Sequence, residues 1–125
     1  MHVSATIPFV DLSAQHQPLQ NQIEQAIRDV MQRGDYILGQ ALSEFEQAFA
    51  AICRSQYGIG VACGTDAIAL GLQACGIGKG DEVILPANTF IATLIGVLRS
   101  GATPVLVDCE AKTALIDLVA AEKAI

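Results

Sequence analysis

The chain has 125 residues, 52% of them hydrophobic, so it is long enough for one folded domain and too apolar to be disordered. Thirteen acidic side chains outnumber seven basic ones, and a net charge of −6 without a basic patch argues against a nucleic-acid partner. No apolar run approaches the roughly 18 residues that a membrane-spanning helix needs. Residues 1–9 lack the basic and apolar segments of a signal peptide. We therefore expect a cytoplasmic protein without a membrane partner.

Cysteines stand at positions 53, 63, 75 and 109, with no C-x-x-C spacing, and the chain has only two histidines. Metal sites need closely spaced ligands of these types, so we expect no metal site. The pattern instead predicts free, mostly buried thiols in a reducing compartment.

The first 55 residues predict an extended arm over residues 1–17 and two helices. Pro18 suits the first turn of a helix, where its missing N–H costs nothing, and Gly34 is a natural stop. Between them, apolar side chains recur every three or four residues, as on one face of a helix. The same spacing predicts a second helix over residues 40–53.

Residues 56–110 alternate short apolar runs with helical patterns, and residues 111–125 end in the start of a further helix. The apolar runs predict strands at 57–62, 82–85 and 103–108. Strands that alternate with helices form parallel sheets with crossover connections. We therefore expect an α/β protein, a three-layer parallel sheet with helices and three main strands, in a single domain over residues 1–125.

The turn that follows the first predicted strand contains Gly64, Thr65 and Asp66. A glycine lets a ligand approach the backbone, and the first N–H groups of a helix attract anions. The turn can thus hold a phosphate, with the Thr65 hydroxyl as a further donor. It can equally be an ordinary capped helix, and the spacing alone favours that simpler interpretation, because no known nucleotide-binding pattern is present.

Other candidate residues follow the later strands. Phe90 opens a helix at a strand end, where its ring can stack on a planar cofactor or pack as a core aromatic, and by itself the core position is the better prediction. Asp108 and Tyr36 can each belong to a site or simply pack. Lys79 and Lys112 lie in loops, which does not suit a lysine that bonds covalently to a carbonyl compound.

Several segments taken together are far more specific than any one of them. They include IPFVDL at 7–12, GDYILG at 34–39, FE at 45–46, GTDA at 64–67, GIGKGDEVI at 76–84, NTFIAT at 88–93 and GATPVLVD at 101–108. In this order the sequence resembles the DegT/DnrJ/EryC1/StrS family of pyridoxal-phosphate-dependent sugar aminotransferases, which have the fold type of aspartate aminotransferase. The resemblance implies a truncated, amino-terminal part of the large domain of such an enzyme.

The resemblance also implies roles for particular residues. Gly64, Thr65 and Asp66 match the stretch that binds the cofactor phosphate through backbone N–H groups and a hydroxyl. Phe90 matches the aromatic residue that stacks on the pyridine ring, and Tyr36 matches a stretch near the active site and subunit contacts. Members of the family work as dimers and move an amino group, usually from glutamate, to a keto-sugar nucleotide.

The match has one large gap. In the family, the lysine that binds the cofactor covalently and the aspartate that pairs with the pyridine nitrogen both align beyond residue 125. We therefore expect no catalytic residue in this chain and no activity of the chain alone, with pyridoxal phosphate implied by the family but not necessarily bound here. Strands that the family places between the first and second are also missing, which predicts re-pairing of the remaining strands.

Two interpretations stay open. In the first, the chain is the amino-terminal piece of a sugar aminotransferase that works with a separate carboxyl-terminal fragment. In the second, it is a catalytically inert α/β module that binds at most phosphate or another small anion at residues 64–66. Unpaired strand edges and apolar surface predict a homodimer or higher self-association in either case.

Overall fold

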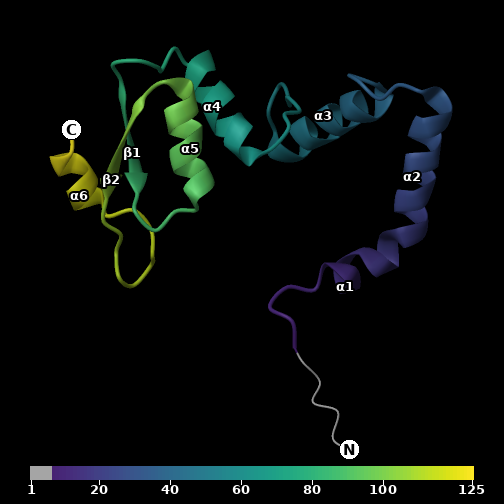
Figure 1. Cartoon of the computed structure of the whole chain (residues 1–125), viewed down its shortest axis with the longest axis horizontal. Coiled ribbons are helices and arrows are strands. Elements are labelled where there is room, and N and C mark those ends of the chain that lie inside the picture. Colours follow the sequence, from purple (N-terminus) through teal and green to yellow (C-terminus); the bar gives the residue numbers. More distant parts are fainter. Residues whose placement is uncertain (1–6) are drawn as a thin grey trace, which may run out of the picture. The chain divides into compact units, whose positions relative to one another are not determined.

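The computed structural model describes residues 7–125 and divides the chain into two compact units, Met1–Ile59 and Gly60–Ile125 (Figure 1). The expectations for residues 1–6, which form part of the predicted arm and of the segment without signal-peptide features, lie outside the described residues. Each unit contains its own set of contacts.

The first unit is helical, with α1 (Leu12–His16), a 3₁₀ turn η1 (Gln17–Leu19), α2 (Gln20–Arg33) and α3 (Gln40–Cys53). The predicted arm is wrong beyond residue 11, because the Asp11 carboxylate accepts a hydrogen bond from the Ala14 N–H at 3.0 Å and so begins a helix. Pro18 lies in η1, and Gly34 ends α2 with a left-handed φ of 71°. The two predicted helices are confirmed.

The apolar stripes of α2 and α3 are largely uncovered within this unit. The stripe residues that are at least 41% exposed are Leu19, Ile23, Ile27, Met31, Phe45, Phe49 and Ile52. Among the described residues of the unit only Ala50 is buried. The spacing of these side chains therefore specifies the helices, while the surface that would bury them is not supplied by the unit itself.

The turn between α2 and α3 is closed by Asp35. Its carboxylate accepts a hydrogen bond from the Gln40 N–H at 2.8 Å and lies 3.2 Å from the Arg33 guanidinium. The Gln40 bond is the main reason that the pKa of Asp35 is held below its ordinary value, with Arg33 adding to the effect and partial burial opposing it. Gly39 is needed here, because a Cβ would collide with the Asp35 carbonyl oxygen.

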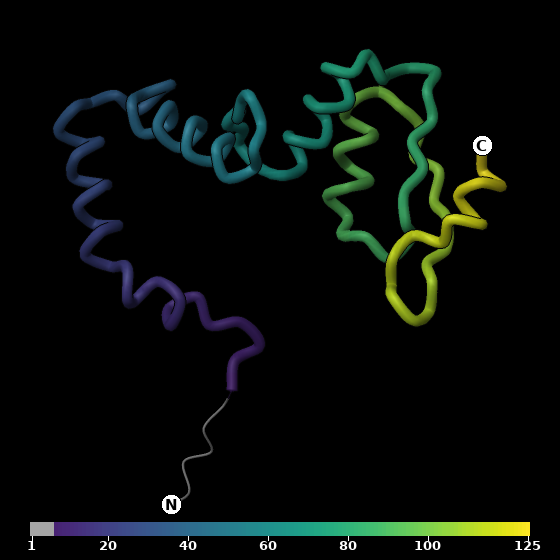
Figure 2. The backbone as a smooth tube through the Cα atoms, turned by 180° about the vertical axis from the view of Figure 1, so that it is seen from behind, coloured from purple at the N-terminus to yellow at the C-terminus, as the bar shows by residue number. Residues whose placement is uncertain are grey.

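The second unit contains α4 (Gly64–Ala74), β1 (Glu82–Pro86), α5 (Ile91–Ser100), β2 (Thr103–Val107) and α6 (Leu118–Lys123). The two strands are parallel, in a register that runs from Glu82 opposite Thr103 to Pro86 opposite Val107. Helix α5 makes the crossover between them, and α6 lies on the other side of the strands from α5 (Figures 1 and 2). The later two predicted strands and the helix after them are confirmed.

The core of this unit lies between the strands and α5. Its buried residues are Leu85 on β1, the fully buried Val97 on α5, and Ala102 just before β2. The half-buried side chains around them are Leu72, Ile77, Val83 and Leu94. The apolar residues of both strands thus pack against α5, the helix that connects them, as expected for a parallel pair.

The expectation of three main strands is not confirmed, because the described sheet has two strands and residues 57–62 pair with neither. Local contacts hold the start of this segment against α3 instead. The Ser55 hydroxyl donates to the Tyr57 carbonyl at 2.9 Å, and Gly58 lies so close to the Glu46 carbonyl that a Cβ would approach it to 2.6 Å. An apolar run becomes a strand only where a neighbouring strand receives its hydrogen bonds.

Both outer edges of the two-stranded sheet are open in the described chain. Two backbone hydrogen bonds at the ends of the ladder show which groups face inward, from Thr103 to Asp81 (2.9 Å) and from Ala87 to Val107 (2.8 Å). Alternate residues of a strand direct their backbone groups to opposite edges. The backbone groups of Glu82, Ile84 and Pro86 therefore face the open edge of β1. Those of Pro104 and Leu106 face the open edge of β2.

Helices α4 and α5 meet at Gly96. A Cβ at this position would lie 2.7 Å from the Ile68 side chain and 3.1 Å from the Thr65 carbonyl oxygen. We predict that Gly96→Ala lowers the free energy of unfolding of this unit by roughly 1–2 kcal/mol, because the clash outweighs the better helix propensity of alanine. Urea denaturation followed by circular dichroism measures the change.

Gly71, in the same helix as Ile68, is the matched control, because a Cβ there meets nothing within 4 Å. We expect Gly71→Ala to raise the free energy of unfolding by about 0.5–1 kcal/mol. Equal effects of the two substitutions would show that α4 and α5 are not in close contact.

Asp35 makes the start of α3 sensitive to acid. Because its pKa is lowered in the folded chain, its stabilising effect is complete above the ordinary aspartate pKa of about 3.9 and is lost as the pH falls through the lowered value. We predict that the helical circular dichroism of the wild type falls more steeply below about pH 4 than that of Asp35→Asn, which does not titrate. Parallel curves for the two proteins would contradict this role.

Candidate functional site

The predicted phosphate turn forms the start of α4. Cys63 precedes the helix in an extended conformation without a side-chain cap, and the first intrahelical bond runs from the Ala67 N–H to the Cys63 carbonyl at 3.0 Å. The N–H groups of Gly64, Thr65 and Asp66 therefore have no acceptor within the helix. Space is open beside Gly64, where a Cβ would meet nothing within 4 Å. Three free donors, the positive end of the helix dipole and open space fit the phosphate of pyridoxal phosphate.

The negative charge of Asp66 at the start of α4 is paired with a cation on α5. The Arg99 guanidinium lies 2.6 Å from the Asp66 carboxylate, and Arg99 was not among the predicted site residues. A carboxylate beside a phosphate would repel it, so the cation keeps the turn suited to an anion. The separation of 33 residues between the pair gave no sequence signal, because the contact depends on how α4 packs on α5.

Phe90 is the residue immediately before α5 and follows the carboxyl end of β1. Its side chain is 78% exposed, so it is not the core aromatic that its position alone favoured. An exposed ring at a strand end is free to stack on a planar ligand. Phe90 lies six residues before Gly96, roughly 9 Å along the helix axis from the contact with the first turn of α4.

The remaining candidate residues lie on other elements of the two units. Asp108 follows β2, and its carboxylate accepts a bond from the Cys109 N–H at 2.7 Å. Tyr36 belongs to the first unit and is 68% exposed, with its hydroxyl 3.5 Å from the Met31 carbonyl oxygen. Lys79 precedes β1 and Lys112 follows β2, and both are exposed.

The four cysteines are free thiols, as expected, but the prediction that they are mostly buried is wrong. Cys53, Cys63 and Cys75 are exposed, and Cys109 is half-buried. The three exposed cysteines lie at helix ends, Cys53 on α3 and Cys63 and Cys75 on α4, whereas Cys109 lies in the loop after β2. Residues 7–125 contain no cluster of side chains suited to holding a metal ion, and none of their helices is long and apolar enough to span a membrane.

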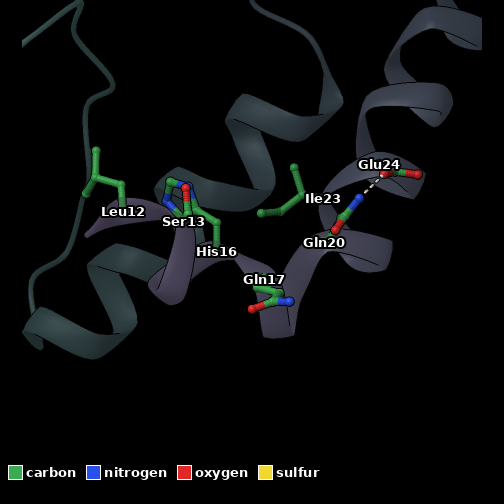
Figure 3. Close-up of a pocket in the computed structure, with 7 residues that line it drawn as sticks. All are labelled: Leu12, Ser13, His16, Gln17, Gln20, Ile23 and Glu24. Carbon is green, nitrogen blue, oxygen red and sulfur yellow. Dashed lines mark hydrogen bonds between the residues drawn. The ribbon is translucent and has the colours of Figure 1, made fainter. Parts of the chain in front are cut away.

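A hollow of about 610 Å³ lies in the first unit (Figure 3). It is lined by Leu12, Ser13, His16, Gln17, Gln20, Ile23 and Glu24. Gln20 donates a hydrogen bond to Glu24 at 2.9 Å along α2. The hollow is an open part of the uncovered α1–α2 face and contains none of the predicted site residues, so the start of α4 stays the candidate anion site.

Comparison with known proteins shows the family to which this chain belongs. The model of the DegT/DnrJ/EryC1/StrS aminotransferase family matches residues 17–125, which is most of the chain. The match places the chain in a family of aminotransferases. The chain belongs to the DegT/DnrJ/EryC1/StrS aminotransferase family.

Two of the similar curated proteins are named as transaminases of dTDP-linked sugars. The dTDP-3-amino-3,6-dideoxy-alpha-D-galactopyranose transaminase of Aneurinibacillus thermoaerophilus is 45% identical over 95% of this chain and 33% of its own length. The dTDP-3-amino-3,4,6-trideoxy-alpha-D-glucose transaminase of Streptomyces venezuelae is 43% identical over 95% of this chain and 31% of its own. The chain therefore spans about a third of the length of the curated relatives it matches.

Solved structures show the same relation. DesV of S. venezuelae, in complex with a ketimine intermediate, superimposes with a TM-score of 0.91 at 43% identity over 95% of this chain and 32% of DesV. The ntda protein of Bacillus subtilis, with bound cofactor PMP, gives a TM-score of 0.90 at 36% identity over 97% of this chain and 28% of its own. The described fold is thus the fold of a segment of these aminotransferases.

Arg99 provides a test of the electrostatics at the start of α4. We predict that Arg99→Ala lowers the affinity for inorganic phosphate about threefold to fivefold, because the Asp66 carboxylate then repels the anion. The stability change should be small, about 0.5 kcal/mol, because the pair is partly exposed. Isothermal titration calorimetry measures the affinity.

A second substitution, Asp66→Asn, should restore phosphate affinity in the Arg99→Ala background. Arg28→Ala is the matched control, because Arg28 pairs with Glu24 on α2. If the phosphate affinity falls equally in Arg28→Ala and Arg99→Ala, the loss comes from the change in net charge and not from repulsion by Asp66.

Proposed function

We propose that these 125 residues form the amino-terminal part of a pyridoxal-phosphate-dependent aminotransferase that acts on a keto sugar attached to a nucleotide. Membership of the family and the names of the relatives support this function. In this proposal the chain supplies part of the cofactor site, and the substrate is chosen by residues elsewhere in the protein.

The start of α4 is the observation that carries the proposal. Gly64, Thr65 and Asp66 offer their N–H groups, and the open side of Gly64 lets an oxygen come close to the backbone. Thr65 adds a hydroxyl donor. These groups bind the phosphate and so fix one end of the cofactor, which orients its reactive end without taking part in the chemistry.

Phe90 holds the other part of the cofactor in this proposal. Its exposed ring stacks on the pyridine ring and excludes water from one face. Pyridoxal phosphate, when bound, supplies the electron sink that lets an amino group pass from a donor to a keto sugar. The side chains of this chain bind and orient that group, and none of them moves a proton.

The chemical step requires a lysine that this chain does not offer in a suitable setting. Its lysines are Lys79, Lys112 and Lys123, and all three are exposed. A lysine that bonds to the cofactor needs a desolvated or cation-rich setting that lowers its pKa. We therefore propose that residues outside this segment supply the covalent lysine and the acidic partner of the pyridine nitrogen, and that the segment alone does not transaminate.

The alternative is an inert module that binds an anion and associates with itself. The uncovered stripes of α2 and α3 favour association, since exposed apolar surface of this extent is costly in water. A second copy, as in a homodimer, or a separate carboxyl-terminal fragment would cover such stripes. Four free thiols suit the reducing cytoplasm in both cases.

Titration of the chain with pyridoxal phosphate tests the proposal. We expect Thr65→Val to lower the affinity about fivefold to tenfold, because a hydrogen bond to a charged phosphate is lost. Thr103→Val is the control, because Thr103 is an exposed residue at the opposite, amino end of β2. Equal affinities of the two variants for pyridoxal phosphate would show that the phosphate site is wrongly assigned.

Reduction with borohydride followed by intact-mass measurement tests the absence of a catalytic lysine. We expect slow, scattered labelling of the exposed lysines in the chain alone. A single stoichiometric adduct on one lysine would show that this chain carries its own covalent residue and would overturn the proposed inactivity.

A further inference from the structure

The position of Phe90 depends on the turn before it. Because its side chain is 78% exposed, packing does little to hold the ring, and the backbone of residues 86–90 must place it. The Thr89 N–H donates to the Pro86 carbonyl at 3.2 Å, which closes the turn. The hydroxyls of Thr89 and Thr93 are 2.8 Å apart, which ties the turn to the first turn of α5.

Asn88 ties the same turn to a second element. Its carboxamide Nδ2 donates to the Ala114 carbonyl at 2.9 Å, and its Oδ1 accepts from the Cys109 thiol at 2.9 Å. Both partners belong to the loop over residues 108–117 that follows β2. One side chain therefore connects the carboxyl end of β1 to the segment beyond the carboxyl end of β2, across a distance of more than 20 residues in sequence.

The 108–117 loop is held together by its own backbone hydrogen bonds. Its backbone bonds run from Glu110 to Leu115 (2.9 Å), from Ala114 to Glu110 (2.8 Å) and from Asp117 to Asp108 (3.0 Å). Ala114 has a left-handed φ of 56°, which is unfavourable for a residue with a Cβ. The Asn88 amide donates its hydrogen bond to the carbonyl of Ala114, so it contacts the loop at the residue with the unfavourable backbone conformation.

We propose that Asn88 is a positioning residue that anchors the Phe90 turn to the 108–117 loop and so fixes the ring for stacking on the cofactor. The inference rests on the proposed function, because it concerns the ring that would contact the cofactor. The hydrogen bonds of the Asn88 side chain go to the 108–117 loop and not to the phosphate turn at residues 64–66. Its loss should therefore weaken the binding of a ligand that has a ring and spare the binding of phosphate alone.

Two ligands separate these effects. Inorganic phosphate reports on the α4 turn, and deoxypyridoxine phosphate adds the pyridine ring but has no aldehyde to react with exposed lysines. We expect Asn88→Ala to lower the affinity of the full chain for deoxypyridoxine phosphate about threefold to tenfold, the range expected from an aromatic stacking contact, with phosphate affinity unchanged. Isothermal titration calorimetry measures both affinities.

A double-mutant cycle assigns the loss to the ring. Phe90→Leu should reduce the affinity for deoxypyridoxine phosphate by itself, and Asn88→Ala should cause no further loss in the Phe90→Leu background. Cys109→Ser keeps a donor to the Asn88 oxygen and should bind as the wild type does, whereas Cys109→Ala should show part of the loss. A general structural defect would give additive losses and would affect both ligands.

Hydrogen exchange shows whether the loop is released. In Asn88→Ala the amides of Glu110 and Asp117 should exchange faster, while amides of the β1–β2 ladder keep their protection. Faster exchange throughout the ladder would mean that the whole unit is destabilised and would overturn the positioning role.

The outcomes distinguish this inference from the function on which it rests. If Phe90→Leu weakens the ring ligand and Asn88→Ala does not, Asn88 has no positioning role and the proposed function stands. If Phe90→Leu has no effect although phosphate binds, or if neither ligand binds, the assigned cofactor site is wrong and the inference falls with it.

Discussion

The parallel pairing of β1 with β2 is the constraint on which the second unit depends. Parallel strands require a crossover, and α5 both makes that connection and covers one face of the pair. The pairing also brings the carboxyl ends of the strands to one edge, which is where Asn88, Phe90 and Asp108 lie. Helix α4 is then held against α5 by the close contact at Gly96. The predicted phosphate turn and the exposed Phe90 thus lie at the starts of two helices that are in direct contact.

The first unit shows a different balance of forces. Its helices have regular apolar stripes, caps at Asp11 and Asp35, and a glycine stop, so local interactions agree with the helical pattern. Its apolar side chains nevertheless remain largely in contact with water. Helices in proteins draw most of their stability from packing, and here the packing surface is not part of the unit. This agrees with a chain that corresponds to about a third of its relatives' length.

The sequence predicted what local patterns control and missed what tertiary contacts decide. Periodicity and stop signals located α2 to α5, β1 and β2. The predicted strand at 57–62 failed, because its residues are apolar enough but contacts with α3 hold Tyr57 and Gly58, and no strand pairs with them. The motif at residues 64–66 indicated an anion site, and the start of α4 fits one. Arg99 and Asn88 could not be found, since each acts on residues more than 20 positions away.

Pro104 makes the two open edges of the sheet unequal in their capacity to bind a further strand. A proline has no N–H, and the backbone groups of Pro104 point away from β1, so β2 offers an incoming strand only the Leu106 donor along its open edge. The open edge of β1 has two donors, from Glu82 and Ile84. A strand added to β1 can therefore form a more complete ladder than one added to β2. Pro104 therefore disfavours the pairing of another chain with the open edge of β2. It leaves β1 as the edge to which further strands can be added.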